Sequence, residues 1–182
     1  MSRLKLGILQ VNHDRSVEVG DAFPDDAHRF RDLFDAQDQR FSYRVYMTIG
    51  GEVPHDVGEQ DAYLITGSPL SVLDDLAFLP DLYDFIRACD AAEKPLFGAC
   101  FGHQAIAVAL GGEVARQDWN IGIDVVEVTE RLPWMTPVQS TINLYQFHHD
   151  AVTGAPEGTV PYARSGKCAI AGFSKGGHIF TT

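Results

Sequence analysis

The chain contains only three cysteines, no basic cluster and no apolar run long enough to cross a bilayer. Cys89, Cys100 and Cys168 neither show metal-ligand spacing nor form an even set, so we expect no metal site and no disulfide framework. Residues 1–7 run directly into an apolar strand pattern, which predicts no signal peptide and a cytoplasmic location. A net charge of −11 argues against nucleic acid or an anionic membrane as a partner.

The remaining composition is that of an ordinary globular protein. Hydrophobic residues make up 45% of the 182 positions and charged residues 21%. A chain of this length suits one domain and can bury a substantial core. No internal repeat, low-complexity tract or linker divides it, and no Gly-rich phosphate loop points to a nucleotide cofactor. We therefore expect a single domain over residues 1–182 that needs no cofactor.

Strand and helix patterns alternate through the first 110 residues. Apolar strand patterns cover residues 4–11, 43–47, 62–66 and 94–98, and helical periodicity covers residues 25–37, 79–92 and 104–110. This alternation predicts an α/β fold with a central, mainly parallel sheet flanked by helices, as in flavodoxin-like domains. The first strand is nearly all apolar, so we expect it inside the sheet. Pro24 suits the first turn of the first helix.

The pattern changes after residue 112. Five strand-like segments, separated by glycine, proline and polar turns, cover residues 121–128, 141–147, 159–164, 168–173 and 178–182. The second half is therefore expected to add antiparallel strands to the sheet.

Residues 98–104, Gly-Ala-Cys-Phe-Gly-His-Gln, form the most informative segment. They lie between an apolar strand pattern and a helical one, which is the context of a nucleophile elbow. Gly98 and Gly102 leave room for a strained turn, and Cys100 would project at the start of a helix, whose dipole favours a thiolate. A buried structural cysteine is the alternative, but it does not explain the two flanking glycines.

A cysteine nucleophile needs an oxyanion hole and an activating base. In an elbow, the amide of the residue after the nucleophile supplies one oxyanion donor, which here is Phe101. The turn at Gly67 to Pro69 also follows a predicted strand, and carboxyl ends of parallel strands share one crevice. Gly67 could therefore supply the second donor, although the turn by itself could be a plain strand-to-helix connection.

Three segments together resemble the class I (triad) glutamine amidotransferases. They are residues 98–104, the Thr-Gly-Ser-Pro at 66–69, and the Gln-Phe-His-His-Asp-Ala-Val at 146–152 followed by Ala-Pro-Glu-Gly at 155–158. Their order and spacing match that family over nearly the whole chain. The stretch 71–75 is most similar to small stand-alone members that resemble the glutaminase domain of GMP synthetase, and some members of that subgroup cleave γ-glutamyl peptides.

The resemblance implies a role for each matched residue. Cys100 would attack the side-chain amide of glutamine, giving a γ-glutamyl thioester and ammonia, while Gly67 and Phe101 hold the oxyanion. Substrate-binding roles would fall to Gln104, Phe147, His149 and Asp150. For His148 and His149, strand-end histidines bonded to the backbone are an equal alternative, and His103 is expected to pack behind the elbow.

One departure from the family pattern concerns the base. The triad histidine and glutamate of the family follow a strand that resembles residues 178–182, and neither residue is present here. We expect the sequence to be a fragment that lacks a His-Pro-Glu segment. The alternatives are an inactive member and, less favoured, a substitute base from His148, His149 or His178.

These observations leave three functions open. The first is a glutaminase or amidotransferase, with glutamine as substrate and an ammonia-accepting synthetase on another chain as a possible partner. The second is a γ-glutamyl peptidase or hydrolase, which uses the same thioester chemistry with a different leaving group. The third is a non-catalytic module that binds glutamine and regulates another protein.

Overall fold

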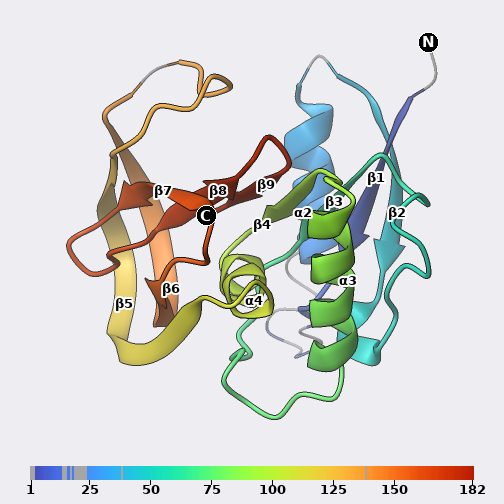
Figure 1. The fold of residues 1–182 in the computed structure, drawn as a ribbon, viewed down its shortest axis with the longest axis horizontal. Helices are drawn as coiled ribbons and strands as arrows, with labels where there is room; N and C mark the ends of the chain where they lie inside the picture. The colour runs from blue at the N-terminus through green and yellow to red at the C-terminus, as the bar shows by residue number, and fades with distance from the viewer. Residues whose placement is uncertain (1–2, 14–15, 17, 19–23, 38, 138) are drawn as a thin grey trace.

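The protein is described by a computed structural model covering residues 1–182, and the structure describes all of them but 1–2, 14–15, 17, 19–23, 38 and 138. Figure 1 shows the order of the elements along the chain. The first half contains β1 (Leu4–Leu9), α2 (Asp26–Asp35), β2 (Phe41–Tyr46), the 3-10 turn η1 (Thr48–Gly50), β3 (Ala62–Ile65), α3 (Leu79–Ala91), β4 (Leu96–Gly98) and α4 (Phe101–Ala109). The second half contains β5 (Glu113–Val128), β6 (Thr141–Gly154), β7 (Thr159–Arg164), β8 (Gly172–Lys175) and β9 (Ile179–Thr181).

All described strands join one sheet in the order β2-β1-β3-β4-β9-β8-β7-β5-β6. From β2 to β9 the pairings are parallel, and from β9 to β6 they are antiparallel. β1 lies between β2 and β3, as its apolar sequence predicts. The expected α/β fold with antiparallel additions is therefore confirmed.

The helices cover opposite faces of the parallel part of the sheet (Figure 1). Alternate residues of β1 point to opposite faces, so Ile8 packs with Ala27 of α2, while Leu9 belongs to the larger core with α3 and α4. In that core Leu82 and Ile106 are fully buried. The same alternation that makes β1 nearly all apolar thus anchors a layer of helix on each side.

Two local expectations need correction at the ends of elements. Pro24 precedes α2 instead of lying in its first turn, because Asp25 caps the helix by accepting a hydrogen bond from the His28 amide. The helix after the elbow begins at Phe101, earlier than the apolar periodicity from Gln104 predicts. The three glycine and polar residues of its first turn hid its start.

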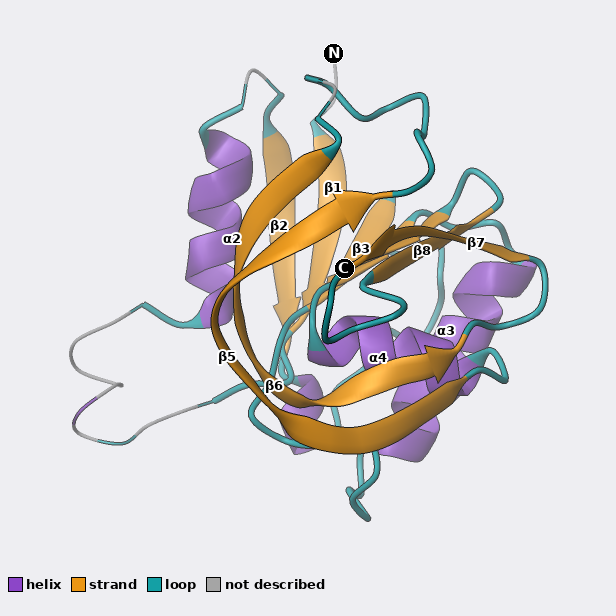
Figure 2. Cartoon of the chain, turned by 90° about the vertical axis from the view of Figure 1, so that its left-hand side faces the viewer, coloured by secondary structure: helices purple, strands orange, loops and turns teal. Residues whose placement is uncertain are grey.

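The β5–β6 hairpin is the main departure from the expected strands. β5 begins eight residues earlier than predicted and β6 ends seven residues later, and the two long strands curve together around one side of the molecule (Figure 2). A register shift between Arg116 and Asn120 interrupts the pairing and accompanies this bend. Cys168, predicted at the start of a strand, instead lies in the loop before β8.

Candidate active site

Cys100 occupies the turn between β4 and α4. Its backbone has φ 50° and ψ −103°, a left-handed φ that a residue with a side chain rarely adopts. The turn is held on both sides, because the Ala99 amide donates to the Ile65 carbonyl at 3.1 Å and the Gly102 amide donates to the Ala99 carbonyl at 2.8 Å. Strand, strained cysteine and helix are therefore arranged as in a nucleophile elbow.

The two glycines of the motif are required by close backbone contacts. A Cβ on Gly98 would lie 2.6 Å from the backbone of Gly102, and a Cβ on Gly102 would lie 2.5 Å from the carbonyl oxygen of Ile65. Neither obstacle is the end of a flexible side chain, so any larger residue would move the elbow away from β3. The glycines thus let α4 start directly against the sheet.

The last strand also holds the elbow. The Cys100 amide donates to the Thr182 carbonyl at 2.7 Å, and the Thr182 amide donates to the Gly98 carbonyl at 2.9 Å. These bonds continue the parallel pairing of β4 with β9 past the end of both strands. The backbone of Thr182 therefore lies directly beside the backbone of Cys100.

His103 packs behind the elbow, as the sequence predicts. Its Nδ1 lies 2.8 Å from the Thr181 hydroxyl and its Nε2 lies 3.0 Å from the Ile170 carbonyl, while its ring lies over that of Phe173. Burial lowers the pKa of His103 to about 4, so the ring is neutral at pH 7. A neutral, doubly bonded imidazole fixes α4 against the second half of the sheet.

Gly67 and Phe101 lie where an oxyanion hole would require them. A Cβ on Gly67 would meet the Cβ of Cys100 at 3.6 Å, which places the turn after β3 against the elbow. The Phe101 amide forms a hydrogen bond with the Cys100 thiol. Both residues thus border the position that a substrate carbonyl bound at Cys100 would take.

The thiol of Cys100 is accessible but not activated. Desolvation by the protein packed around it raises its pKa above the usual value, the bond from the Phe101 amide lowers it, and the charge of Asp26 raises it further. The expectation that the helix start alone would favour a thiolate is therefore wrong for the described residues. The helix dipole is outweighed because no cationic group among these causes stabilises the negative charge.

A small cavity of about 70 Å³ opens beside the thiol. It brings together the turn after β3, the elbow and the middle of the β5–β6 hairpin, and its lining is Ser68, Pro69, Leu70, Cys100, Gln104, Trp119, Phe147, His148, His149 and Asp150. Four residues predicted to bind substrate, Gln104, Phe147, His149 and Asp150, are thus assembled around Cys100 from two separate elements. Such convergence of polar groups in a concave site is typical of a binding pocket.

Asp150 and Gln104 are tied into a buried network. The Asp150 carboxylate accepts hydrogen bonds from the Ser71 hydroxyl and from Arg116 Nε, the latter at 3.1 Å. Desolvation alone would raise its pKa, but the bonds from Ser71 and Arg116 bring it below the usual value. The Gln104 side-chain amide donates to the Asp150 carbonyl at 2.8 Å. The carboxylate therefore braces the pocket, and a ligand would meet mainly the Gln104 amide and the backbone near Asp150.

The three histidines considered as substitute bases are all engaged elsewhere. His148 bridges the Asp150 carbonyl and the Gln146 side chain at 3.1 and 2.9 Å. His149 stacks on Trp119 with ring centroids 4.2 Å apart. His178 lies 3.0 Å from Asp90, which also pairs with Lys175. For His148 the structure matches the alternative of a strand-end histidine bonded to the backbone.

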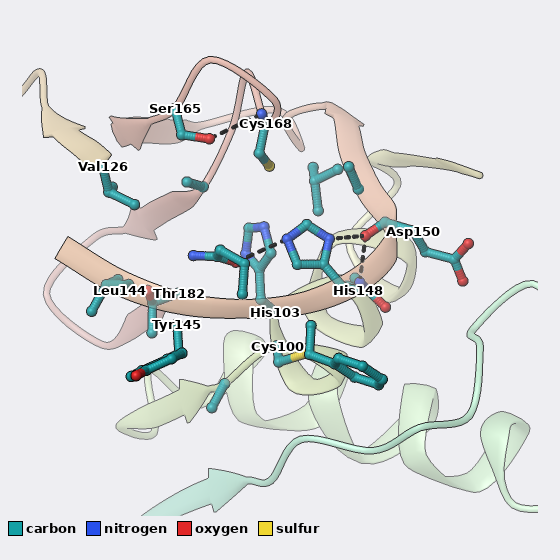
Figure 3. A pocket seen from close by; sticks show the side chains of 17 residues that line it. Cys100, His103, Val126, Leu144, Tyr145, His148, Asp150, Ser165, Cys168 and Thr182 are labelled. Carbon is teal, nitrogen blue, oxygen red and sulfur yellow. Dashed lines mark hydrogen bonds between the residues drawn. The ribbon is translucent and has the colours of Figure 1, made fainter. Parts of the chain in front are cut away.

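A larger cavity of about 240 Å³ opens on the other side of the same residues. It shares Cys100, Gln104, Phe147, His148 and Asp150 with the small one and adds a mostly apolar lining that includes Val126, Leu144, Ala171 and Cys168. In Figure 3 the Tyr145 and Cys100 side chains lie on one side of the β6 ribbon, with His148 and Cys168 on the other. The nucleophile position is thus accessible from two directions.

Sequence reasoning missed Trp119, Arg116 and Tyr145. Trp119 and Arg116 come from β5, which the sequence did not extend this far, and their partners lie on another strand. One signal was present: Trp119, Ile121, Ile123 and Val125 alternate with polar or small residues, which is the pattern of a strand with one apolar face.

Fold and site together define a class: α/β proteins that carry a cysteine at a strand–turn–helix elbow facing a concave pocket. The class I glutamine amidotransferase family model matches residues 45–181. The chain therefore belongs to the class I glutamine amidotransferases, as the three motifs indicated, and the family and its relatives are amidotransferases and hydrolases.

The related proteins fall on both sides of the glutaminase and peptidase alternatives. The chain is 28% identical over 146 residues to gamma-glutamyl peptidase 3 of Arabidopsis thaliana, which covers 75% of this chain and 59% of that protein. It is 34% identical over 116 residues to a glutamine-hydrolysing GMP synthase subunit of Methanosarcina acetivorans, covering 62% and 56%. The chain thus spans somewhat more than half the length of these relatives.

Solved structures show the same fold. A glutamine amidotransferase from Thermotoga maritima superposes with a TM-score of 0.79 at 22% identity, over 100% of this chain and 75% of that one. A glutamine amidotransferase from Methylobacillus flagellatus gives 0.77 at 24% identity, over 98% and 68%. In the described part of the chain, no helix is long and apolar enough to cross a membrane.

Proposed function

We propose that the chain is the glutaminase domain of an enzyme that hydrolyses the side-chain amide of glutamine through a thioester on Cys100. The observation that carries the proposal is the strained elbow itself: a cysteine at φ 50° beside Gly67 and the Phe101 amide, facing a pocket closed by Gln104 and Asp150. Left-handed strain at a residue with a side chain persists where function requires that geometry.

The proposed reaction has two steps. Cys100 Sγ bonds to the side-chain amide carbon, the Gly67 and Phe101 amides stabilise the resulting oxyanion, and the C–N bond breaks as ammonia leaves with a proton. Water then attacks the thioester, releasing glutamate and restoring the thiol. Gln104 and the backbone from Phe147 to Asp150 would orient the α-amino and α-carboxylate groups of the substrate. The ammonia would pass to a synthetase on another chain.

The base is proposed to be a histidine, with its glutamate, in a segment that follows Thr182 in the full gene product. Support comes from the position of β9, because a chain continuing past Thr182 would emerge beside Cys100. Without such a base the raised pKa of Cys100 leaves little thiolate at pH 7. The three free cysteines fit a reducing compartment such as the cytoplasm.

Ammonia release from glutamine by residues 1–182 and by a version extended through the next gene segment tests this function. General-base assistance is worth about 10²–10⁴ in rate, so the extended protein should be faster by that factor and its Cys100→Ala variant inactive. Equal rates for the short and extended proteins would revive a substitute base, to be sought with His148→Ala. If neither protein releases ammonia but both bind glutamine, the chain is a regulatory module.

A γ-glutamyl peptidase is the second candidate, and the larger cavity favours it. Ammonia is small, whereas about 240 Å³ of largely apolar space adjoins Cys100. Comparing ammonia from glutamine with free amino acid from a γ-glutamyl dipeptide separates the two candidates.

A further inference from the structure

One face of the β5–β6 hairpin is a continuous, exposed apolar surface. The antiparallel register places Ile121 opposite Phe147 and Ile123 opposite Tyr145, all on the same face, and Trp119 contacts Phe147 at 5.5 Å between ring centroids. We call these five residues the apolar wall. Their side chains are between 54% and 86% exposed, Tyr145 the most. A single-chain surface rarely leaves such a contiguous apolar patch without a binding role.

The apolar wall begins at the nucleophile. Trp119 and Phe147 line the small cavity together with Cys100, and Tyr145 lines the larger cavity together with Cys100. Trp119 is held in place by stacking on His149. From this base the wall continues outward along the hairpin through Ile121 and Ile123. A ligand held at Cys100 that extends beyond the small cavity would therefore meet an aromatic and aliphatic surface.

Free glutamine does not use this surface. Its polar α-groups and its small ammonia leaving group gain nothing from apolar contact, whereas an apolar group leaving water gains about 25 cal/mol per Å². The substrate that fits both the polar pocket and the apolar wall has a γ-glutamyl group at one end and an apolar group at the other.

We infer that the apolar wall selects γ-glutamyl amides of apolar amines, aliphatic or aromatic, over glutamine. The inference rests on the proposed function. In the reaction, Cys100 Sγ bonds to the γ-carbonyl carbon, the C–N bond breaks, and the amine leaves with the proton that the thiol gives up. Water then hydrolyses the thioester to glutamate and the thiol. The wall holds the apolar group of the substrate during the first step.

The test measures binding without turnover, so it does not depend on a base. Cys100 is alkylated with a glutamine-like chloroketone, and protection is measured with glutamine and with the γ-glutamyl amides of methylamine, butylamine and benzylamine. We expect half-protection by the benzylamide at about tenfold lower concentration than by the methylamide, since roughly 60 Å² of additional apolar surface would be buried. The butylamide should fall between them.

Variants on the exposed wall locate the effect. Tyr145→Ser and Ile121→Ser should each reduce the preference for the benzylamide by about threefold. Val125→Ser is the matched control, because Val125 lies on the same face and is similarly exposed but sits four residues beyond Ile121, about 13 Å further from the pocket. It should retain the full preference.

The outcomes separate the inference from the function on which it rests. If glutamine protects Cys100 but all amides protect equally, the inference is overturned and the wall serves another purpose, such as contact with a protein. The same follows if the preference survives in Tyr145→Ser and Ile121→Ser. If the chloroketone does not label Cys100 or glutamine gives no protection, the proposed function fails, and the inference fails with it.

Discussion

His103 Nδ1 and the Thr181 hydroxyl lie 2.8 Å apart, although 78 positions separate them in the chain. This contact joins the first turn of α4 to β9, and the same hydroxyl also bonds with the amide and carbonyl of Phe173. The next residue, Thr182, accepts the amide of Cys100. His103 therefore positions the elbow from behind, through the strand that holds the Cys100 backbone.

The buried ring of His103 predicts a loss of stability in mild acid. Its pKa is about 4 in the folded protein and near 6.5 when unfolded, so between these values the unfolded chain binds a proton that the folded chain does not. The free energy of unfolding should fall as pH drops from 6.5 to 4, by at most about 1.4 kcal/mol per pH unit from this group.

Urea unfolding across this pH range checks the prediction. His103→Gln removes the titrating group and should flatten the profile between pH 6.5 and 4. His55→Gln, at an exposed histidine, is the control and should keep the slope of the parent. A parent profile as flat as that of His103→Gln would contradict the assigned state of the ring.

Cys100 should be the first thiol to be alkylated. Cys89 is fully buried, and burial raises its pKa to about 12, so it should stay unmodified. Because the Cys100 pKa also lies above its usual value, its labelling rate should rise about tenfold per unit between pH 7 and 9. Mass spectrometry of iodoacetamide-treated protein measures both. Prior modification of Cys89 or Cys168, or a plateau in the Cys100 rate below pH 8, would contradict this environment.

Glycines on the two sides of the thiol should tolerate alanine differently. Gly102→Ala places a Cβ 2.5 Å from the Ile65 carbonyl oxygen and should lower the free energy of unfolding by about 1–3 kcal/mol. Gly67→Ala meets only an ordinary contact at 3.6 Å and should change stability by less than about 0.5 kcal/mol. Thermal unfolding of both variants compares them, and equal losses would place the elbow differently from the structure.

The Asp150 carboxylate should stabilise the fold at neutral pH. Asp150→Asn weakens the bonds from Arg116 and Ser71 and should cost about 2 kcal/mol at pH 7. The pKa of Asp150 is lowered on folding, so the difference from the parent should be complete above pH 4 and disappear as pH falls further.

Asp74→Asn provides the matched control for this carboxylate. Asp74 also approaches Arg116, at 3.9 Å, but its side chain is 53% exposed. An exposed ion pair contributes at most about 1 kcal/mol, so this variant should remain close to the parent. Urea unfolding at pH 7 and pH 3 measures both variants, and equal losses would contradict a special role for the buried carboxylate.

The sequence predicted what is local and missed what depends on distant pairing. The elbow could be recognised because Gly98, Cys100 and Gly102 impose its geometry within one turn. The parallel strands and α3 could be recognised because their apolar periodicity is uninterrupted. By contrast, the register shift after Arg116 breaks the alternation of β5, so only its second part had a strand pattern.

The same distinction holds within the site. Ser71 and Asp150 are 79 positions apart, and nothing local to either residue indicates that they share a hydrogen bond. The stacking of Trp119 on His149 likewise requires the hairpin register. The pKa of Cys100 could not be foreseen from its place at a helix start, because desolvation depends on the packing of the whole domain.

The bonds between Cys100 and Thr182 also set an order in time. During synthesis the elbow segment leaves the ribosome long before β9, yet its backbone is fixed only when β9 pairs with β4. The thiol is therefore present in the nascent chain before the turn that would aim it at a substrate. Reactivity at this cysteine is a property that the protein acquires late in its assembly.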